Sequence, residues 1–383
     1  MKKVALFIKH YSIGKSSPII CLIDLLSDCY DGVDIYVQDV WCTNAAVLTK
    51  ENVRLIEVPD LGTGFRGMFN RLWSLVASRY HYEDDYMDIF CFDPHGLILC
   101  SEVFPGATPF YYSLELYFRE NHYNLPYSRW EMRRDRALIH SIRGLIIQSE
   151  EREGLFRREY GLSSEINTFI LPVTYQQQSC TEKRSHVREK YGIGRDKKVA
   201  LHLGGIQGYF SCIEIALAFS RIEDWVMIFH GYYFGEYIEH FKAMLQENRI
   251  TNVIISDEYF EFIEDMDPLL MSCDLGIAWY NDLSPNFTTS GRSSGKISAY
   301  LRFGLPVVAN RYPSTESSLE QTGCGICVDT FAEIKDAVER IASDYRYYSD
   351  NCIKEYDRVY WFENYRESLT AFISGSSGHQ STT

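Results

Sequence analysis

The chain has 383 residues, of which 46% are apolar and 15% are aromatic. This length exceeds one ordinary hydrophobic core, and the composition excludes a globally disordered chain. The net charge of −14 argues against a nucleic-acid-binding protein, because neutralising phosphates needs a surplus of lysine and arginine. We therefore expect two folded domains and no nucleic-acid partner.

The first ten residues, MKKVALFIKH, contain an apolar run that is too short for a signal peptide or a membrane span. This run predicts a cytoplasmic protein. The region from Arg129 to Arg158 is locally basic, and it fits contact with an anionic membrane or an anionic substrate. A solvated helix face, paired with Glu131, Asp135 and Glu150, explains the same region equally well. Its arginines are Arg129, Arg133, Arg134, Arg136, Arg143, Arg152, Arg157 and Arg158.

Short apolar runs rich in valine, isoleucine and phenylalanine alternate with amphipathic stretches such as 19–27 and 66–78. The runs in the first half of the chain are 4–8, 34–37, 54–58, 88–92, 109–112, 144–148 and 168–172. Strands that alternate with helices predict a parallel sheet.

The polar stretch 176–196 interrupts this alternation, which predicts a linker with one short helix. The pattern then restarts, with runs at 199–203, 225–229, 252–255, 274–279, 306–309 and 325–328. We therefore predict an α/β fold of two doubly wound, Rossmann-like domains that face a cleft, comprising residues 1–175 and 197–355. An aromatic-rich helix at 356–373 should pack back on the first domain through Trp361 and Phe362. The Gly/Ser/Thr-rich tail, 374–383, should be disordered.

The segment LHLGGIQGYFS follows the first strand of the second domain. Gly204, Gly205 and Gly208 precede a helix that should begin near Ser211. Glycines let backbone N–H groups approach a phosphate, and a helix N-terminus adds partial positive charge. The same glycines are also typical of a turn that only connects a strand to a helix, and both interpretations stay open.

The segment SSGKISAYLRFGLPVVAN gives a stronger prediction. Ser293, Ser294 and Gly295 should present free N–H groups at a helix start, where Lys296 adds a full positive charge. Apolar residues spaced along one face should seat this helix on the sheet, and Gly304 should end it before a strand. These apolar residues are Ile297, Tyr300 and Leu301. Together these features predict a diphosphate site.

Metal binding is not predicted. Asp265 and Asp267 are close in sequence, but Asp267 before Pro268 is typical of a helix N-cap followed by proline. Cys324 and Cys327 form the only close pair of cysteines, and no second pair or histidine cluster completes a zinc site.

The first domain offers polar candidates near strand ends. Gly14 and Lys15 follow the first strand, Asp93 and His95 lie in DPHG, and Glu115 lies in SLELY. His95 fits either a bond to a reacting sugar hydroxyl or a satisfied loop histidine. Glu115 fits either a catalytic role or an exposed residue at a helix start.

The segment SPNFTTSGRSSGKISAYLRFGLPVVAN resembles the signature of family 4 of the retaining glycosyltransferases, a two-domain GT-B class. The matching residues are Ser284, Pro285, Asn286, Lys296, Tyr300, Leu301, Gly304, Pro306, Val307, Val308 and Ala309. LHLGGIQG, MSCDLGIAWY, YWFENYRESL, DPHGL, YYSLELY and INTFILPV are similar to other segments of that family, so the resemblance covers nearly the whole chain.

This resemblance implies metal-independent transfer of a sugar from a nucleotide-sugar donor, with retention, to a glycan, lipid-linked or protein acceptor. It implies no cofactor, and a role in polysaccharide or glycoconjugate biosynthesis. The implied donor-binding residues are Gly14, Gly204, Gly205, Gly208, Tyr259, Ser293, Ser294, Gly295 and Lys296. The candidate catalytic residues for this activity are Lys296 and, from their places near strand ends, Asp93, His95 and Glu115.

The sequence departs from the family at two carboxylates. Where members carry a glutamate that accepts hydrogen bonds from the donor ribose, this chain has Ala299, and eight positions earlier it has Gly291. The basic residues common in the first glycine loop are also absent from GGIQGYF. Charge-assisted hydrogen bonds contribute roughly 1.5–3 kcal/mol each. Two hypotheses follow: an active transferase that recognises the ribose differently, and a catalytically silent subunit that stabilises a partner enzyme. A nucleotide-sugar epimerase is a weaker third.

Overall fold

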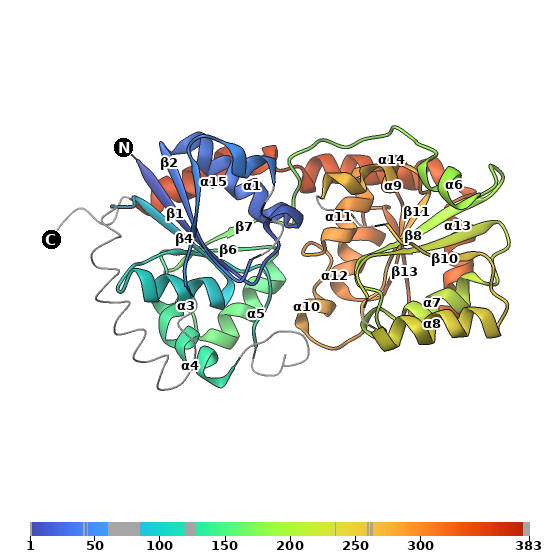
Figure 1. Cartoon of the computed structure of the whole chain (residues 1–383), viewed down its shortest axis with the longest axis horizontal. Helices are drawn as coiled ribbons and strands as arrows, with labels where there is room; N and C mark the ends of the chain where they lie inside the picture. Colours follow the sequence, from blue (N-terminus) through green and yellow to red (C-terminus); the bar gives the residue numbers. More distant parts are fainter. Residues whose placement is uncertain are drawn as a thin grey trace. The chain divides into compact units, whose positions relative to one another are not determined.

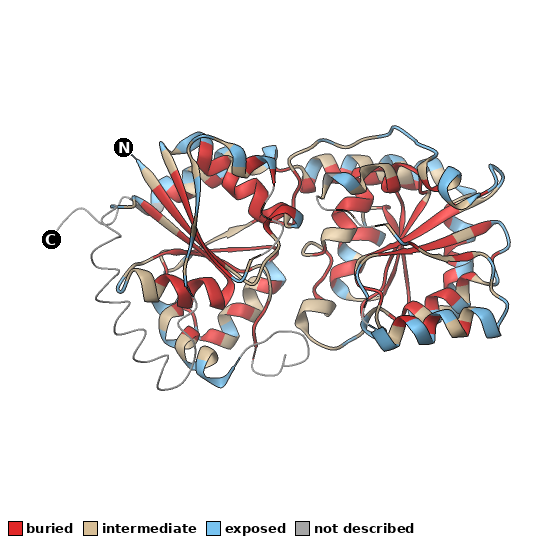
Figure 2. Cartoon of the chain, in the orientation of Figure 1, coloured by how far each residue is buried: buried red, intermediate tan, exposed pale blue. Residues whose placement is uncertain are grey.

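The computed structural model describes residues 2–40, 43, 45–59, 85–118, 128–233, 235–258, 260 and 263–377 (Figure 1). The chain forms two compact units: Met1–Pro172 with Tyr365–Thr383, and Val173–Asn364. Each unit contains a sheet whose described strand pairings are all parallel, with helices between successive strands, as the sequence predicted. In Figure 2 the strands of both sheets are largely buried, whereas the outward faces of the helices are exposed.

The first unit has a seven-stranded sheet in the order β3-β2-β1-β4-β5-β6-β7. Its strands are β1 (Lys3–Lys9), β2 (Gly32–Gln38), β3 (Val53–Glu57), β4 (Asp88–Phe92), β5 (Phe110–Tyr112), β6 (Gly144–Ile147) and β7 (Asn167–Ile170). Its described helices are α1 (Ser17–Cys29), α3 (Asp93–Val103), α4 (Arg129–Leu138), α5 (Glu150–Tyr160) and α15 (Glu363–Ser377), of which α15 belongs to this unit from Tyr365 onward.

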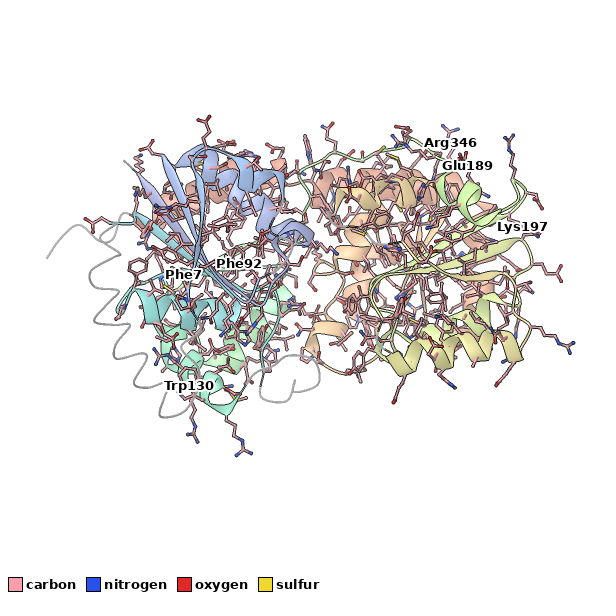
Figure 3. All side chains as sticks on the ribbon, in the orientation of Figure 1. Phe7, Phe92, Trp130, Glu189, Lys197 and Arg346 are labelled. Atoms are coloured by element: carbon pink, nitrogen blue, oxygen red, sulfur yellow. The ribbon has the colours of Figure 1, made fainter. Side chains whose placement is uncertain are left out.

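The centre of this sheet is fully buried because helices cover both faces, as in other parallel sheets. Phe7 on β1 and Phe92 on β4 have no exposed surface (Figure 3). Phe7 stacks on Tyr36 of β2 with ring centroids 4.7 Å apart. The continuous apolar runs of the sequence are therefore core strands.

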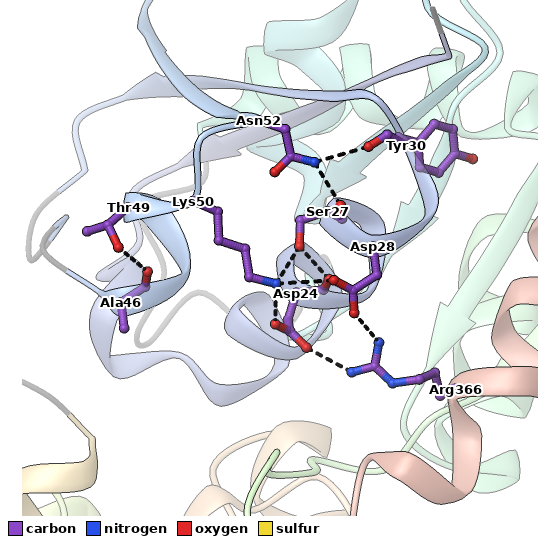
Figure 4. Close-up of polar contacts among 9 residues, drawn as sticks. All are labelled: Asp24, Ser27, Asp28, Tyr30, Ala46, Thr49, Lys50, Asn52 and Arg366. Carbon is purple, nitrogen blue, oxygen red and sulfur yellow. Dashed lines mark hydrogen bonds and ion pairs between the residues drawn. The ribbon is translucent and has the colours of Figure 1, made fainter.

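The terminal helix α15 is held on the first unit by charged and aromatic contacts. Arg366 donates to Asp24 (2.8 Å) and Asp28 (3.0 Å) on α1, and Lys50 donates to Asp24 (2.7 Å) (Figure 4). Phe372 packs against Phe110 of β5, with ring centroids 5.7 Å apart.

Trp361 and Phe362, which we expected to pack on the first domain, are assigned to the second unit, and that packing stays a prediction. The Trp361 indole donates to Gln176 O (3.1 Å) and the Phe362 amide donates to Tyr175 O (2.9 Å). The predicted tail also begins too early, because α15 continues to Ser377. Residues 378–383 lie outside the described part.

The second unit has a six-stranded sheet in the order β10-β9-β8-β11-β12-β13. Its strands are β8 (Lys198–Leu203), β9 (Trp225–His230), β10 (Val253–Ile255), β11 (Leu275–Ala278), β12 (Val307–Asn310) and β13 (Gly325–Val328). Its described helices are α6 (His186–Tyr191), α7 (Cys212–Phe219), α8 (Gly235–Glu247), α9 (Asp267–Met271), α10 (Pro285–Thr288), α11 (Gly295–Arg302), α12 (Pro313–Thr315), α13 (Ile334–Ser343) and α14 (Tyr345–Glu355).

The polar stretch 176–196 is packed into the second unit rather than forming a separate linker. The Cys180 amide donates to Arg302 O (2.8 Å). On α6, Val187 is fully buried and Arg188 donates to Asp274 (3.1 Å). Hydrogen bonds to the rest of the unit therefore compensate for the low hydrophobicity of this stretch.

The arginines between 129 and 158 do not form one continuous basic face. Arg152 is 1% exposed, Arg143 pairs with Asp88, and Arg136 pairs with Glu159. The exposed arginines are Arg129 and Arg133 on α4 and Arg158 on α5, and Trp130 on α4 is 44% exposed (Figure 3). Within the described part of the chain, no helix is long and apolar enough to cross a membrane.

Candidate functional site

The short helix α11 is held against the second sheet by Tyr300. Its hydroxyl donates to Leu201 O (2.9 Å) and accepts from the Leu203 amide (2.7 Å), both on β8. Gly276 on β11 makes room for this ring, because a Cβ there would lie 2.3 Å from Tyr300. The helix ends where predicted, since Gly304 adopts the left-handed conformation (φ 61°). These contacts fix the N-terminus of α11 relative to β8.

Lys296, in the first turn of α11, has a buried ammonium nitrogen without a hydrogen-bond partner among the described residues. Its Nζ lies 4.2 Å from the ring centroid of Phe210 and 4.8 Å from that of Tyr280. Burial lowers the pKa of Lys296 to about 7, opposed only by the Cys212 thiol. An amine in this setting gains most from an anionic partner.

The glycine loop between β8 and α7 passes directly over this amine. Gly204 has φ 119°, which disfavours any other residue, and a Cβ there would lie 3.6 Å from Lys296 Nζ. Directly after β9, Gly231 is also required to be glycine, because the backbone of Gly204 approaches it closely. A Cβ at Gly231 would lie 1.8 Å from Gly204 O. Glycine at both positions therefore lets the backbone after β9 pack against the backbone of Gly204, which lies beside Lys296.

The other two glycines of the loop have different surroundings. Gly205 lies between the rings of Phe210 and Tyr232, each 3.1 Å from a Cβ placed there. Gly208 is exposed, and its carbonyl accepts from the Asn281 side chain (2.9 Å). The structure thus brings Gly204 to Lys296 and Gly205 to Phe210, whereas Gly208 anchors the loop to the residues after β11.

The predicted free amides of Ser293 and Ser294 are occupied, which corrects our expectation. Both donate to Ser290 O, at 3.2 Å and 2.9 Å. Ser294 Oγ caps the helix by accepting from the Ile297 amide (3.2 Å). The N–H groups of Gly295 and Lys296 remain, because the first helical residues have no acceptor within their own helix.

The positions of the two missing glutamates have no room for a carboxylate. A Cβ at Gly291 would lie 2.1 Å from Ser314 O, and the Gly291 amide donates to Ser314 Oγ (3.4 Å). Ala299 is 2% exposed within the apolar core of the second unit. The packing around Gly291 and Ala299 therefore leaves no space for a glutamate side chain at either position.

In the first unit, Asp93 joins the ends of two neighbouring strands. It follows β4 in a left-handed conformation (φ 54°), which is strained for aspartate, and is fully buried. Its Oδ1 accepts from the amides of Leu114 (2.7 Å) and Glu115 (3.2 Å), after β5, and its Oδ2 accepts from the Tyr11 hydroxyl. Burial and the Glu115 carboxylate raise the pKa of Asp93 to about 7.

Glu115 lies in a bend after β5, so it is not a helix-start residue. Its side chain is half-buried, and burial raises its pKa against the lowering effect of Arg152. Arg152, on α5, donates to Leu114 O (3.0 Å). The ends of neighbouring strands thus gather two carboxyls and a guanidinium, which sequence reasoning found only in part.

His95 and Gly14 are also internal to the first unit. His95 lies in the first turn of α3, 3% exposed, with Nε2 3.6 Å from Glu131 and its ring 4.9 Å from that of His10. It is therefore a buried helix residue rather than a loop histidine. Gly14 is buried in the 3₁₀ turn that precedes α1.

Two other residues singled out from the sequence, and the expected absence of a metal site, complete the comparison. Tyr259 lies outside the described residues. Asp267 begins α9 but makes no capping bond; it accepts instead from Arg302 (2.9 Å). The described residues contain no group of three potential metal ligands.

Residues 261–359 match the family model of the glucosyltransferase 3-like C-terminal domain. This segment contains α11, Lys296 and the strands on either side of them. A search among curated proteins finds no match.

The whole chain is similar to solved glycosyltransferase structures. Anabaena HepE, solved with UDP and glucose, is 15% identical with a TM-score of 0.76, covering 98% of this chain and 100% of HepE. Sucrose-phosphate synthase from Thermosynechococcus elongatus is 13% identical with a TM-score of 0.73, covering 98% and 99%. WaaG, a glycosyltransferase of lipopolysaccharide biosynthesis, is 14% identical with a TM-score of 0.65, covering 97% and 100%. The chain has the GT-B fold. The fold predicted from the resemblance is thereby confirmed.

Several site residues of this GT-B protein were missed by sequence reasoning. Phe210 and Tyr280 surround Lys296 from positions 86 and 16 residues earlier in the chain. Tyr232 lies against Gly205, and Gly231 against Gly204. A glycine directly after a predicted strand was the available signal for Gly231, but nothing in the pattern distinguished these aromatics from core residues.

Proposed function

We propose that the protein transfers a sugar from a nucleotide-sugar donor, and that the second unit binds the donor diphosphate at Lys296. The observation that supports this most is the buried Lys296 Nζ, which has no hydrogen-bond partner among the described residues and lies below Gly204 at the start of α11. A diphosphate would supply the missing acceptors, and the amides of Gly295 and Lys296 would add two donors.

Stabilising the charge that develops on the leaving diphosphate is then the main catalytic contribution of this site. Lys296 would carry that charge stabilisation in a buried environment, where electrostatic interactions are stronger than in water. We propose retention of the anomeric configuration, because the chain resembles retaining family members. We also propose turnover without a metal ion, because Lys296 can supply the positive charge.

The acceptor would be bound by the first unit, with catalytic contributions from Asp93, His95 and Glu115. Glu115 is the strongest of these candidates, since its side chain is half-buried and its carboxylate interacts electrostatically with the Arg152 guanidinium. A hydroxyl-bearing acceptor, such as a glycan, a lipid-linked sugar or a protein side chain, fits a carboxylate that can accept its proton.

The alternative function is that of a silent subunit that stabilises a partner enzyme. One observation favours it: the positions of both missing glutamates are filled, at Gly291 by Ser314 and at Ala299 by the core. A silent subunit would conserve the fold without needing a donor.

A panel of nucleotide sugars, measured by thermal shift and calorimetry, separates the two functions. The transferase should bind at least one donor, and Lys296→Met should weaken that binding ten-fold or more, equivalent to about 1.4 kcal/mol. Product NMR then reports the anomeric configuration, and turnover in EDTA reports the metal requirement. If no donor binds, the proposed transferase function is wrong.

A further inference from the structure

The surroundings of Lys296 contain aromatic rings where a buried ammonium usually has acidic partners. Phe210, Tyr280 and Phe287 form an aromatic enclosure, with ring centroids 5.9 Å apart for Phe210–Tyr280 and for Phe210–Phe287. Lys296 Nζ lies against the first two rings, at 4.2 Å and 4.8 Å. No carboxylate of the described residues influences its pKa.

The titratable groups that face Lys296 cannot balance its charge. They are Cys212 on α7, His202 on β8 and Tyr280 after β11. Burial raises the pKa of Cys212 to about 11 and lowers that of His202 well below its usual value, so both are neutral near pH 7. His202 Nε2 hydrogen-bonds with Gly205 O (3.1 Å), which makes this nitrogen the protonated one.

An ammonium in this position is costly in the free protein. Contact with aromatic faces contributes about 0.5–2 kcal/mol, whereas a buried cation without hydrogen-bond acceptors loses much more hydration energy than this. Such a group loses its proton instead, and the pKa of about 7 for Lys296 agrees with this. An arriving diphosphate reverses the balance, because it supplies both negative charge and acceptors.

We propose that the nucleotide sugar binds together with one proton, which Lys296 takes up from solvent as it changes from a neutral amine to an ammonium. This inference rests on the proposed function and concerns the regulation of the same site. The step moves one proton onto Lys296 Nζ and breaks no other bond. Donor affinity should then fall by up to ten-fold for each pH unit above about 7.

Phe210 controls this coupling in our proposal. Its ring centroid lies 4.2 Å from Lys296 Nζ. The loop segment GGIQGYF contains no lysine or arginine, so a proton on Lys296 would supply the positive charge at this point. Phe210→Ala should admit water beside Lys296, raise its pKa and reduce proton uptake. Phe210→Leu, which keeps an apolar cover, is the matched control.

Calorimetry measures the uptake directly. UDP-glucose is the first probe, because its diphosphate is esterified at both ends and does not itself titrate near neutral pH; any other donor from the panel serves equally. The binding enthalpy is measured near pH 8 in buffers of different ionisation enthalpy. The slope of binding enthalpy against buffer ionisation enthalpy gives the number of protons taken up. It should be about 0.9 proton per donor near pH 8 and about 0.1 near pH 6, since the pKa of Lys296 in the free protein is about 7.

The possible outcomes are distinguishable. Binding without uptake near pH 8 overturns the proton coupling and leaves the transferase standing. Uptake that persists in Lys296→Met assigns the proton to another group and also overturns the inference. Lys296→Arg, which cannot lose its proton, should bind without uptake. Absence of binding by every nucleotide sugar overturns both the coupling and the proposed function.

Discussion

Asp93 in the first unit and Lys296 in the second are both buried titratable groups placed after a parallel strand or at a helix start. Asp93 accepts from two backbone amides and the Tyr11 hydroxyl, with Arg152 nearby. Lys296 Nζ has two aromatic rings and no acceptor among the described residues. Asp93 therefore has protein partners that hold its strand ends together, whatever it adds to catalysis, whereas the amine of Lys296 lacks an acceptor that a ligand would supply. The predictions below test this difference.

The largest effect should come from removing the acceptor in the first unit. Asp93→Ala leaves the Leu114 and Glu115 amides and the Tyr11 hydroxyl without their partner, and should lower the free energy of unfolding by about 3–5 kcal/mol. Denaturant unfolding measures this value. Asp93→Asn is the control: its side-chain oxygen can still accept from the amides, so it should cost less than half as much. Equal losses would show that the amide contacts contribute little.

Ala299→Glu should also be strongly destabilising, by about 3 kcal/mol, because Ala299 is 2% exposed in the core. This differs from the expectation based on the sequence alone, in which a glutamate there offers the ribose an acceptor. Ala299→Gln separates size from charge and should cost less. Chemical denaturation gives the stabilities. Wild-type stability combined with tighter donor binding would show that the side chain escapes the core and reaches the ligand.

Sequence reasoning found the strands well and the site in part. All thirteen predicted strands overlap observed ones, because continuous apolar runs in a doubly wound fold are buried on both faces. Lys296 was selected because glycine, serine and lysine before an apolar helix are typical of an anion site. The structure leaves its amine without an acceptor among the described residues, and its binding role stays a prediction. The places of Phe210, Tyr280 and Arg152 beside the candidate site residues were not predicted. They depend on contacts between residues far apart in the sequence, which local sequence patterns do not show.

The pH dependence of stability should have opposite signs for the two groups. The pKa of Asp93 in the folded state, about 7, lies above its unfolded value, so the native state binds more protons and stability falls as the pH rises from about 4 to 7. The pKa of Lys296, also about 7, lies below its usual 10.5, so the unfolded state binds more protons and stability rises from about pH 7 to 10.

Each dependence should approach about 1.4 kcal/mol per pH unit within its window. It is measured as the difference in unfolding free energy between the wild type and a variant without the titrating group, Asp93→Asn or Lys296→Met. Lys296→Met should also be more stable than the wild type below pH 7, since it removes an unsatisfied cation from an apolar site. Parallel pH profiles for wild type and Lys296→Met would contradict the buried, unpaired state of this amine.

The smallest effect should come from the ion pairs that hold the terminal helix α15. Unlike Asp93 and Lys296, these charged groups are partly exposed to water. Arg366, 28% exposed, donates to Asp24 and Asp28, whose exposures are 19% and 57%. Water and salt screen such pairs, so Arg366→Ala should lower the unfolding free energy by about 0.5–1 kcal/mol, and less in molar salt. Arg346, whose side chain is 93% exposed beside Asp350, is the matched control (Figure 3), and Arg346→Ala should change stability by less than about 0.5 kcal/mol.

Because Phe372 still packs on Phe110 in the Arg366 variant, α15 should remain folded on the first unit, and limited proteolysis should show it protected. Release of α15 would mean that these ion pairs, rather than the aromatic contacts, hold the helix in place.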